Sequence, residues 1–243
     1  MKLLLISNST NAGEAYLGWP QGFIQDFLLK HGIRKVVFIP YAGVNLSAVS
    51  LTKSYDIYEE RVSGVFRTLG FELVSVHQAS DPKQAIQQAE CIVVGGGNTF
   101  HLVSMMHETA IMSLIRQKVS EGTPYIGWSA GANVACPTLR TTNDMPIIEP
   151  ASFDCLNLIP FQINPHYLDA NPEGHGGETR QQRIEEFLAL NRDITVAGLR
   201  EASLLEMEEG KLILKGHRSL RVFNFGKEPS EYEVGTDMSF LLK

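Results

Sequence analysis

The chain has 243 residues and a formal net charge of −6, with 44% hydrophobic and 20% charged residues. This length and composition suit a single globular domain over residues 1–243 that can bury a sizeable core. No basic stripe, no apolar run of about 18 residues and no secretory signal is present, so we expect no nucleic acid partner, no membrane span and a cytoplasmic location.

Short apolar runs alternate with amphipathic segments through the first 200 residues. The apolar runs lie at 3–6, 36–40, 71–76, 91–94, 125–128, 161–163 and 194–199. The amphipathic segments, which predict helices, lie at 21–31, 55–69, 82–89, 112–121 and 178–190. Continuous apolar runs are typical of parallel strands covered on both faces, so the alternation predicts a doubly wound, mostly parallel α/β sheet.

The last 40 residues follow a different pattern. Strand-like runs at 203–207, 211–214 and 221–225 are separated by turn signals. We expect residues 203–243 to form an antiparallel β meander packed at the edge of the parallel sheet, within the same domain.

Ligands of an open α/β sheet bind outside the carboxyl ends of its strands. Residues capable of chemistry or of close backbone approach follow five predicted strands: Tyr41, the segment 95–98, Ser129, His166 and Glu201. The sequence therefore predicts a functional site at this edge of the sheet.

The motif G-x-S-x-G spans residues 127–131, with Ser129 at its centre. It follows an apolar strand and opens into a stretch of small residues, which is the strand–turn–helix context of a nucleophile elbow. The five-residue pattern alone also fits a tight turn whose glycines serve packing. The context favours Ser129 as a nucleophile.

A serine nucleophile requires a neighbouring base, and histidine is the usual one near neutral pH. Among seven histidines, His166 is the best candidate because it ends a predicted strand and Pro165 interrupts the ladder before it. The alternative is a loop histidine bonded to backbone. His166 and His175 have no carboxylate or cysteine partner at metal-ligand spacing, so no metal is expected.

Two carboxylates could orient the imidazole of the base. Glu201 follows the strand at 194–199, and Asp144 lies in the polar loop at 140–144. A strand end positions a side chain more accurately than a loop does, which favours Glu201. The alternatives are a solvated turn residue for Glu201 and a turn or cap former for Asp144. The order Ser…His…Glu differs from that of α/β-hydrolases and argues against an ordinary lipase or esterase.

Three glycines and an asparagine follow the strand at 91–94. Glycine lets a substrate approach the backbone closely, so the amides of Gly97 and Ala130 are the candidate oxyanion donors. We expect Asn98 to contact substrate. The alternatives are a phosphate-binding turn or a plain β–α turn; neither nucleotide-binding glycine pattern is present.

Arg180 follows a glycine-rich loop and stands at the start of the helix predicted next along the chain. Arginine binds carboxylates through two parallel hydrogen bonds, so Arg180 could bind the carboxylate of an acidic substrate despite the negative net charge of the protein. From the residues alone, a surface arginine paired with Glu178 is the better interpretation.

Seven segments together resemble the peptidase E family, the α-aspartyl dipeptidases. They are LLISNST (4–10), FIPYAGV (38–44), VVGGGNTF (93–100), YIGWSAGAN (125–133), TTNDMPI (141–147), QINPH (162–166) and PEGHGGETRQQRI (172–184). The resemblance runs from the first strand to about residue 201, and the tail carries little of it. In one departure, Arg200 and Ala202 stand where the family often has proline and glycine around the glutamate.

The resemblance implies a fold like class I glutamine amidotransferases, which is flavodoxin-like, with serine in place of their cysteine. It implies hydrolysis of Asp-X dipeptides with no cofactor and no metal, so the expected partner is a small acidic dipeptide. Carried over, Ser129 is the nucleophile, His166 the base and Glu201 the third triad member, for which Asp144 has also been proposed. Arg180 falls where the family is thought to bind the aspartyl carboxylate.

Other functions remain open from the sequence. They are a cyanophycinase-like exopeptidase that cuts β-aspartyl bonds, a general esterase, and a non-catalytic binding module on the same fold. The sequence also leaves open the leaving residue, the physiological peptide and the oligomeric state, for which a monomer or a homodimer is expected.

Overall fold

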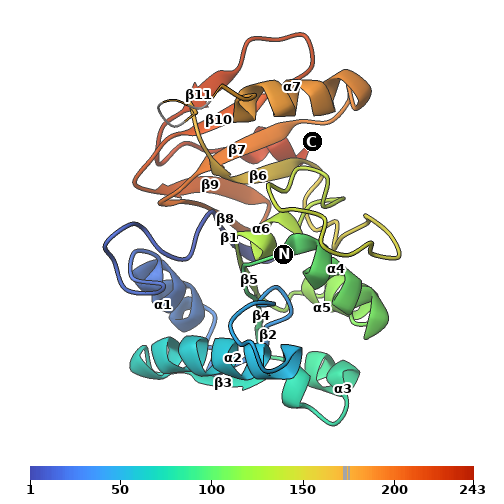
Figure 1. Cartoon of the computed structure of the whole chain (residues 1–243). Coiled ribbons are helices and arrows are strands. Elements are labelled where there is room, and N and C mark those ends of the chain that lie inside the picture. Colours follow the sequence, from blue (N-terminus) through green and yellow to red (C-terminus); the bar gives the residue numbers. More distant parts are fainter. Residues whose placement is uncertain (172–173, 175) are drawn as a thin grey trace.

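The computed structural model describes residues 1–171, 174 and 176–243, and a seven-stranded sheet forms its centre (Figure 1). The strand order is β3-β2-β4-β5-β1-β8-β9. The strands are β1 (Lys2–Ile6), β2 (Lys35–Ile39), β3 (Glu72–Ser75), β4 (Ile92–Val94), β5 (Tyr125–Trp128), β8 (Ser203–Glu208) and β9 (Lys211–Gly216). The first five are parallel to one another, while β8 and β9 join as an antiparallel edge.

Helices cover both faces of this sheet. Helices α1 (Gln21–Lys30) and α2 (Leu51–Thr68) pack on one face, and α3 (Pro82–Gln87), α4 (Thr99–Glu108) and α5 (Met112–Ser120) pack on the other. In β1, Leu3 and Leu5 join one core cluster while Leu4 and Ile6 join the other. Successive strand residues point to opposite faces, so a continuous apolar run is what a doubly covered strand requires.

A second sheet of four strands lies beyond β1 and β8, in the order β11-β10-β7-β6 (Figure 1). Its strands are β6 (Gln162–Tyr167), β7 (Val196–Arg200), β10 (Leu220–Phe223) and β11 (Ser230–Tyr232). Strands β6 and β7 are parallel, and β10 pairs antiparallel with both β7 and β11. Helix α7 (Arg180–Leu190) packs on this sheet through Ile184 and Leu188. The remaining short elements are α6 (Ala130–Asn133) and two 3₁₀ turns, Val76–Gln78 and Ser239–Leu242.

The predicted α/β class, with a mostly parallel sheet and an antiparallel C-terminal edge, is confirmed. The allocation of strands was wrong in two places. The runs at 161–163 and 194–199 belong to the second sheet, and the last run, at 221–225, leaves the edge hairpin to pair with β7. An apolar run indicates that both faces of a strand are covered, but it carries no information about which sheet the strand joins.

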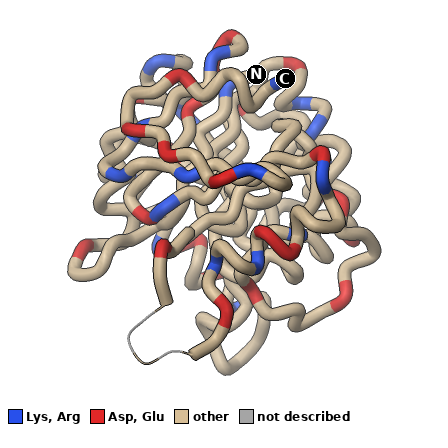
Figure 2. The backbone as a smooth tube through the Cα atoms, turned by 90° about the horizontal axis from the view of Figure 1, so that it is seen from above, with Lys and Arg blue, Asp and Glu red and all other residues tan. Residues whose placement is uncertain are grey.

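In the backbone trace of Figure 2, Lys and Arg residues are interspersed with Asp and Glu residues along the chain. None of the helices in the described part of the chain is both long and apolar enough to cross a membrane.

Candidate active site

Ser129 occupies the sharp turn between β5 and the short helix α6. Its φ of +54° lies in the left-handed region, which is uncommon for non-glycine residues and strains the backbone at this turn. The Ser129 amide donates a hydrogen bond to the carbonyl of Ile6 at 2.9 Å, which joins the turn to the end of β1. A Cβ on Gly127 would lie 2.3 Å from the Gly131 oxygen, and one on Gly131 would lie 2.1 Å from the Val94 oxygen. Both glycines of the motif are therefore required by the close approach of backbone.

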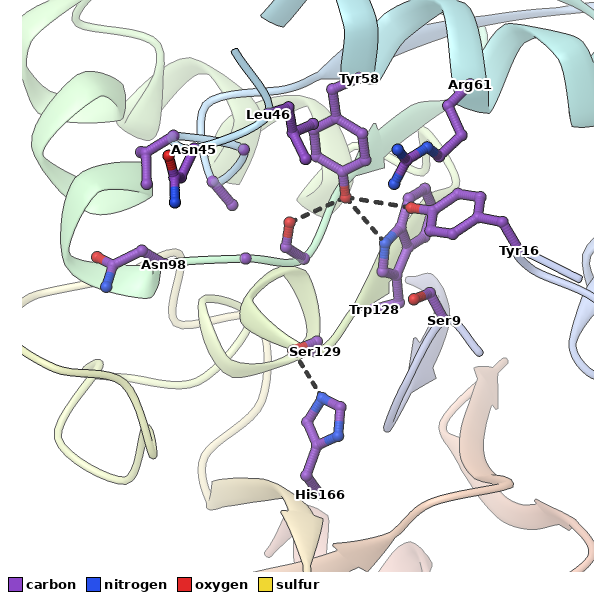
Figure 3. A pocket seen from close by; sticks show the side chains of 15 residues that line it. Ser9, Tyr16, Asn45, Leu46, Tyr58, Arg61, Asn98, Trp128, Ser129 and His166 are labelled. Atoms are coloured by element: carbon purple, nitrogen blue, oxygen red, sulfur yellow. Dashed lines mark hydrogen bonds between the residues drawn. The ribbon is translucent and has the colours of Figure 1, made fainter. Parts of the chain in front are cut away.

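His166 lies on a bulge near the end of β6. Its φ is +53°, and the pairing of β6 with β7 shifts register between Pro165 and Tyr167. Bulges of this kind redirect a side chain out of the strand's regular alternation. The His166 Nε2 atom lies 2.9 Å from Ser129 Oγ, which is hydrogen-bonding distance (Figure 3).

Glu201 directly follows β7, the neighbour of β6. Its Oε1 atom lies 2.8 Å from His166 Nδ1. When Nδ1–H donates to this carboxylate, Nε2 presents its lone pair to the Ser129 hydroxyl. The structure thus brings Ser129, His166 and Glu201 into one hydrogen-bonded chain.

Ser7, at the end of β1, joins the two sheets beneath this chain. Its hydroxyl donates to the carbonyl of Leu199 in β7 at 2.8 Å and accepts from the His166 amide at 3.0 Å. Ser7 is fully buried. It therefore fixes the backbone of the histidine relative to the sheet that carries the nucleophile.

Arg200 reinforces the same region from the other side. It is buried and binds Asp169, which follows β6, and Glu231 of β11. It also donates to the carbonyl and the hydroxyl of Ser219. Hydrogen bonds from Arg200 lower the pKa of Asp169 and of Glu231. The segments that follow His166 and precede Glu201 are thereby held together.

Asp144 makes no hydrogen bond to His166 within the described residues. Its Oδ2 atom instead accepts from the amide and hydroxyl of Thr99, at 2.7 and 2.6 Å, and from the hydroxyl of Thr142 at 3.0 Å. It therefore stabilises the first turn of α4. Of the two carboxylates considered from the sequence, the structure brings Glu201 to the histidine.

The segment 95–98 runs beside the nucleophile turn. Gly97 has a φ of +133°, and a Cβ there would lie 2.2 Å from the Ala42 oxygen; one on Gly96 would lie 2.8 Å from the Ser129 Cβ. In the described structure, the amides of Gly97 and Ala130 donate to no protein acceptor. Both are thus free to bind an oxyanion formed near Ser129.

A buried tyrosine, Tyr58 of α2, orders this glycine segment. Its hydroxyl donates to the Gly96 carbonyl at 2.9 Å, and the Trp128 indole donates to the Tyr58 oxygen at 3.2 Å. The Tyr16 hydroxyl lies 3.3 Å from the same oxygen. Burial raises the pKa of Tyr58, so its hydroxyl stays protonated and remains a donor.

Asn98 caps α4. Its Oδ1 atom accepts from the His101 amide at 3.0 Å, and its Nδ2 donates to the Met145 carbonyl at 2.9 Å. The side chain is held by the protein on both ends while it also lines the cavity beside Ser129.

Two cavities adjoin the site. The first, of about 350 Å³, opens at Ser129 and His166 and reaches to α2 (Figure 3). It is lined by Ser9, Tyr16, Ala42, Gly43, Val44, Asn45, Leu46, Tyr58, Arg61, Gly96, Gly97, Asn98, Trp128, Ser129 and His166. The second, of about 140 Å³, contains Asp144 and Arg180 together with Asn164 of β6.

The second cavity lies against the strand that carries the histidine. Asn143 donates to the carbonyl of Pro165 at 2.6 Å, and Asn164 donates to Asn143 Oδ1 at 2.7 Å. Burial and the nearby Arg183 lower the pKa of the Arg180 guanidinium. Arg180 therefore lies beside Asp144 and not in the cavity that contains Ser129.

Several residues of the site carried no recognisable signal in the sequence. Tyr58 and Arg61 lie within an amphipathic helix, where an aromatic residue at helical spacing is typical of core and an arginine of surface. Ser7 follows an apolar strand with no motif around it. His175 lies outside the described residues, and within the described ones no three His, Cys, Asp or Glu side chains gather as metal ligands would.

Known proteins match this chain over nearly its whole length. A model of peptidase family S51 matches residues 3–215. Peptidase E of Nostoc sp. (strain PCC 7120) is 50% identical over 242 residues, covering 100% of this chain and 97% of the relative. Peptidase E of Salmonella typhimurium (strain LT2) is 46% identical over 235 residues, covering 97% and 99%.

A solved structure shares the fold. The crystal structure of a peptidase from an acI-B1 actinobacterium superposes with a TM-score of 0.69 at 16% identity, covering 98% of this chain and 96% of that one. The resemblance read from the seven sequence segments is confirmed by these matches: the chain belongs to peptidase family S51.

Proposed function

We propose that this member of peptidase family S51 is a serine-type dipeptidase that cuts the peptide bond after an N-terminal aspartate. The observation that supports the serine mechanism is the chain of hydrogen bonds from Ser129 Oγ to His166 Nε2 and from His166 Nδ1 to Glu201. Its two distances, 2.9 and 2.8 Å, are those of a base that can accept the hydroxyl proton and of a carboxylate that orients it.

The reaction proceeds in two stages. His166 takes the proton of Ser129 as Oγ attacks the scissile carbonyl, and the amides of Gly97 and Ala130 stabilise the oxyanion. His166 then gives this proton to the leaving amine, which departs and leaves an aspartyl ester on Ser129. Water, deprotonated by His166, hydrolyses the ester and restores the free serine.

The preference for aspartate is assigned to the second cavity. Arg180 binds the side-chain carboxylate of the aspartyl residue, since arginine is suited to that group. Asp144 binds the free ammonium group through Oδ1. Its Oδ2 atom accepts hydrogen bonds from Thr99 and Thr142, whereas no described residue donates to Oδ1. Asn143 of this cavity donates to the carbonyl of Pro165, the residue before His166, and Asn164 donates to Asn143. These contacts support the proposal that the cavity lies next to the histidine.

The test compares hydrolysis of Asp-Leu, Leu-Leu, Glu-Leu and β-Asp-Leu by the wild-type protein and by Ser129→Ala. We expect the wild-type protein alone to cut Asp-Leu, and neither protein to cut the other three dipeptides at a comparable rate. Preferential cleavage of β-Asp-Leu would assign the protein to β-aspartyl exopeptidases instead. Equal turnover by the wild type and the variant would rule out Ser129 as the nucleophile.

A further inference from the structure

The cavity beside Ser129 has one charged feature that the mechanism above does not use. We infer that Arg61 binds the free α-carboxylate of the leaving residue, so that the cavity of about 350 Å³ is the leaving-residue subsite. The inference rests on the proposed function and adds to it the reason why the substrate is a dipeptide.

The charge of this cavity comes from a single side chain. Among the described residues that line it, Arg61 alone carries a permanent charge, and no carboxylate is present. No carboxylate of the described chain lies within 4.0 Å of its guanidinium. The guanidinium lies over the ring of Tyr16, 5.6 Å from its centroid. In a protein of net charge −6, this unpaired cation makes the cavity selective for an anion.

The walls of the cavity suit an amino acid residue. Tyr16, Leu46 and Trp128 provide apolar surface, and Figure 3 shows Arg61 on the same side as Tyr16, away from His166. Arg61 is exposed on α2, one turn after the buried Tyr58. It therefore stands where the cavity meets solvent, and its long side chain can move toward a bound ligand without disturbing the core.

The chemistry of the substrate identifies the anion. If the aspartyl side chain enters the cavity of Arg180, the residue beyond the scissile bond must enter the cavity of Arg61. In a dipeptide that residue ends in a free carboxylate, which the two parallel donors of a guanidinium fit. In a longer peptide an uncharged amide takes its place. Arg61 thus selects for chains that end one residue after the cut.

The test compares Asp-Leu with Asp-Leu amide, which lacks only the terminal charge. In the wild-type protein we expect Asp-Leu to be the better substrate. Arg61→Gln should lower kcat/KM for Asp-Leu by roughly ten- to a hundredfold, the usual effect of losing a charge-assisted pair, while the amide changes less than about twofold. Arg61→Lys should restore part of the loss, mainly through KM.

The matched control is Arg67→Gln, an exposed arginine of the same helix that does not line the cavity. This variant should have the wild-type kcat/KM for both Asp-Leu and Asp-Leu amide. As a second measurement, calorimetry on Ser129→Ala should show tighter binding of Asp-Leu than of its amide, and Arg61→Gln in that background should remove the difference.

Three results would overturn the inference. Arg61→Gln could lower the rates of both substrates equally, which would assign Arg61 to the aspartyl side or to the fold. It could leave both rates unchanged, which would deny it any contact with substrate. A wild-type protein that cuts neither compound would refute the proposed dipeptidase itself, and the subsite with it.

Discussion

The hydroxyl of Tyr58 donates a hydrogen bond to the carbonyl of Gly96 at 2.9 Å, and this bond fixes the orientation of the Gly96–Gly97 peptide. In a trans peptide the C=O and N–H groups point in opposite directions. Tyr58 and Ser129 lie on opposite sides of the segment (Figure 3), so the Gly97 amide is turned toward the nucleophile. A residue of helix α2 thereby holds a candidate oxyanion donor in place.

Tyr58→Phe removes this hydrogen bond and leaves the Gly96 carbonyl free to rotate. We expect kcat for Asp-Leu to fall about tenfold or more with KM nearly unchanged, because an oxyanion donor acts mainly in the transition state. The free energy of unfolding should fall by about 1–3 kcal/mol, since buried polar groups lose their partner. Steady-state kinetics and urea titration measure the two effects.

Tyr55→Phe is the matched control. Tyr55 is a buried tyrosine of the same helix, and its hydroxyl has no hydrogen-bond partner among the described residues. Its loss should leave kcat unchanged and stability equal or slightly higher. Equal loss of kcat in both variants would show that Tyr58 acts through packing and not through Gly96.

Substitutions of Glu201 and of Asp144 should affect different kinetic constants. Glu201→Gln removes the carboxylate that orients His166, so kcat should fall roughly a thousandfold or more. Asp144→Asn leaves the hydrogen-bonded chain intact and should act mainly on KM, with some loss of stability because Asp144 accepts from both groups of Thr99. A larger loss of kcat in Asp144→Asn than in Glu201→Gln would indicate that Asp144 is the third member of the triad.

Arg200→Gln should reduce stability and flatten its dependence on acid pH. The Arg200 hydrogen bonds hold the pKa values of Asp169 and Glu231 below their usual 3.8 and 4.5. A depressed pKa stabilises the fold above the unfolded value, and this contribution is lost as pH falls through the folded value. The free energy of unfolding of the wild-type protein should therefore decrease as the pH falls below about 4.5, and that of the variant should decrease less.

Both carboxylates are partly exposed, so we expect a loss of only roughly 2 kcal/mol at pH 7 for Arg200→Gln. Urea unfolding at pH 3, 4, 5 and 7 gives the profile. The surface pair of Lys35 and Glu72 provides the comparison, since Lys35→Gln should change stability little at any of these values. A wild-type and variant profile of equal slope would contradict the assignment.

Ala202→Gly should stabilise the turn after Glu201. Ala202 has a φ of +61°, which costs an alanine about 1 kcal/mol and costs glycine almost nothing. Its amide donates to Asn8 Oδ1 and its carbonyl accepts from the His217 amide, so the conformation is fixed from both sides. The melting temperature should rise by a few degrees with kcat unchanged. A lower melting temperature would mean that the methyl group contributes packing that outweighs the strain.

Much of this site could be predicted because its residues follow strands. The rule that ligands bind at the carboxyl ends of a parallel sheet singled out Ser129, His166 and Glu201, and the structure brings these three together. The same rule could not predict that the histidine and the glutamate belong to a second sheet, because an apolar run has the same pattern in either sheet.

The residues that the sequence did not reveal act through long-range contacts. Tyr58 reaches Gly96 across 38 positions and Ser7 reaches His166 across 159, so no local spacing could indicate either pair. Arg180 was interpreted from the residues alone as a surface arginine paired with Glu178, and it lies in a separate cavity with Asp144. Cavities depend on how loops from distant elements meet, which periodicity does not record.

The division of the hydrogen-bonded chain between two sheets has a consequence for how the molecule can lose function. Ser129 follows β5 of the seven-stranded sheet, whereas His166 lies in β6 and Glu201 follows β7 of the four-stranded sheet. Ser7 bonds to both β6 and β7 where the two sheets meet. A slip of about one ångström between the sheets would separate the base from the nucleophile, although each sheet would keep its own strand pairing. The catalytic rate should therefore fall when the two sheets lose their alignment, before any measurement of secondary structure detects a change.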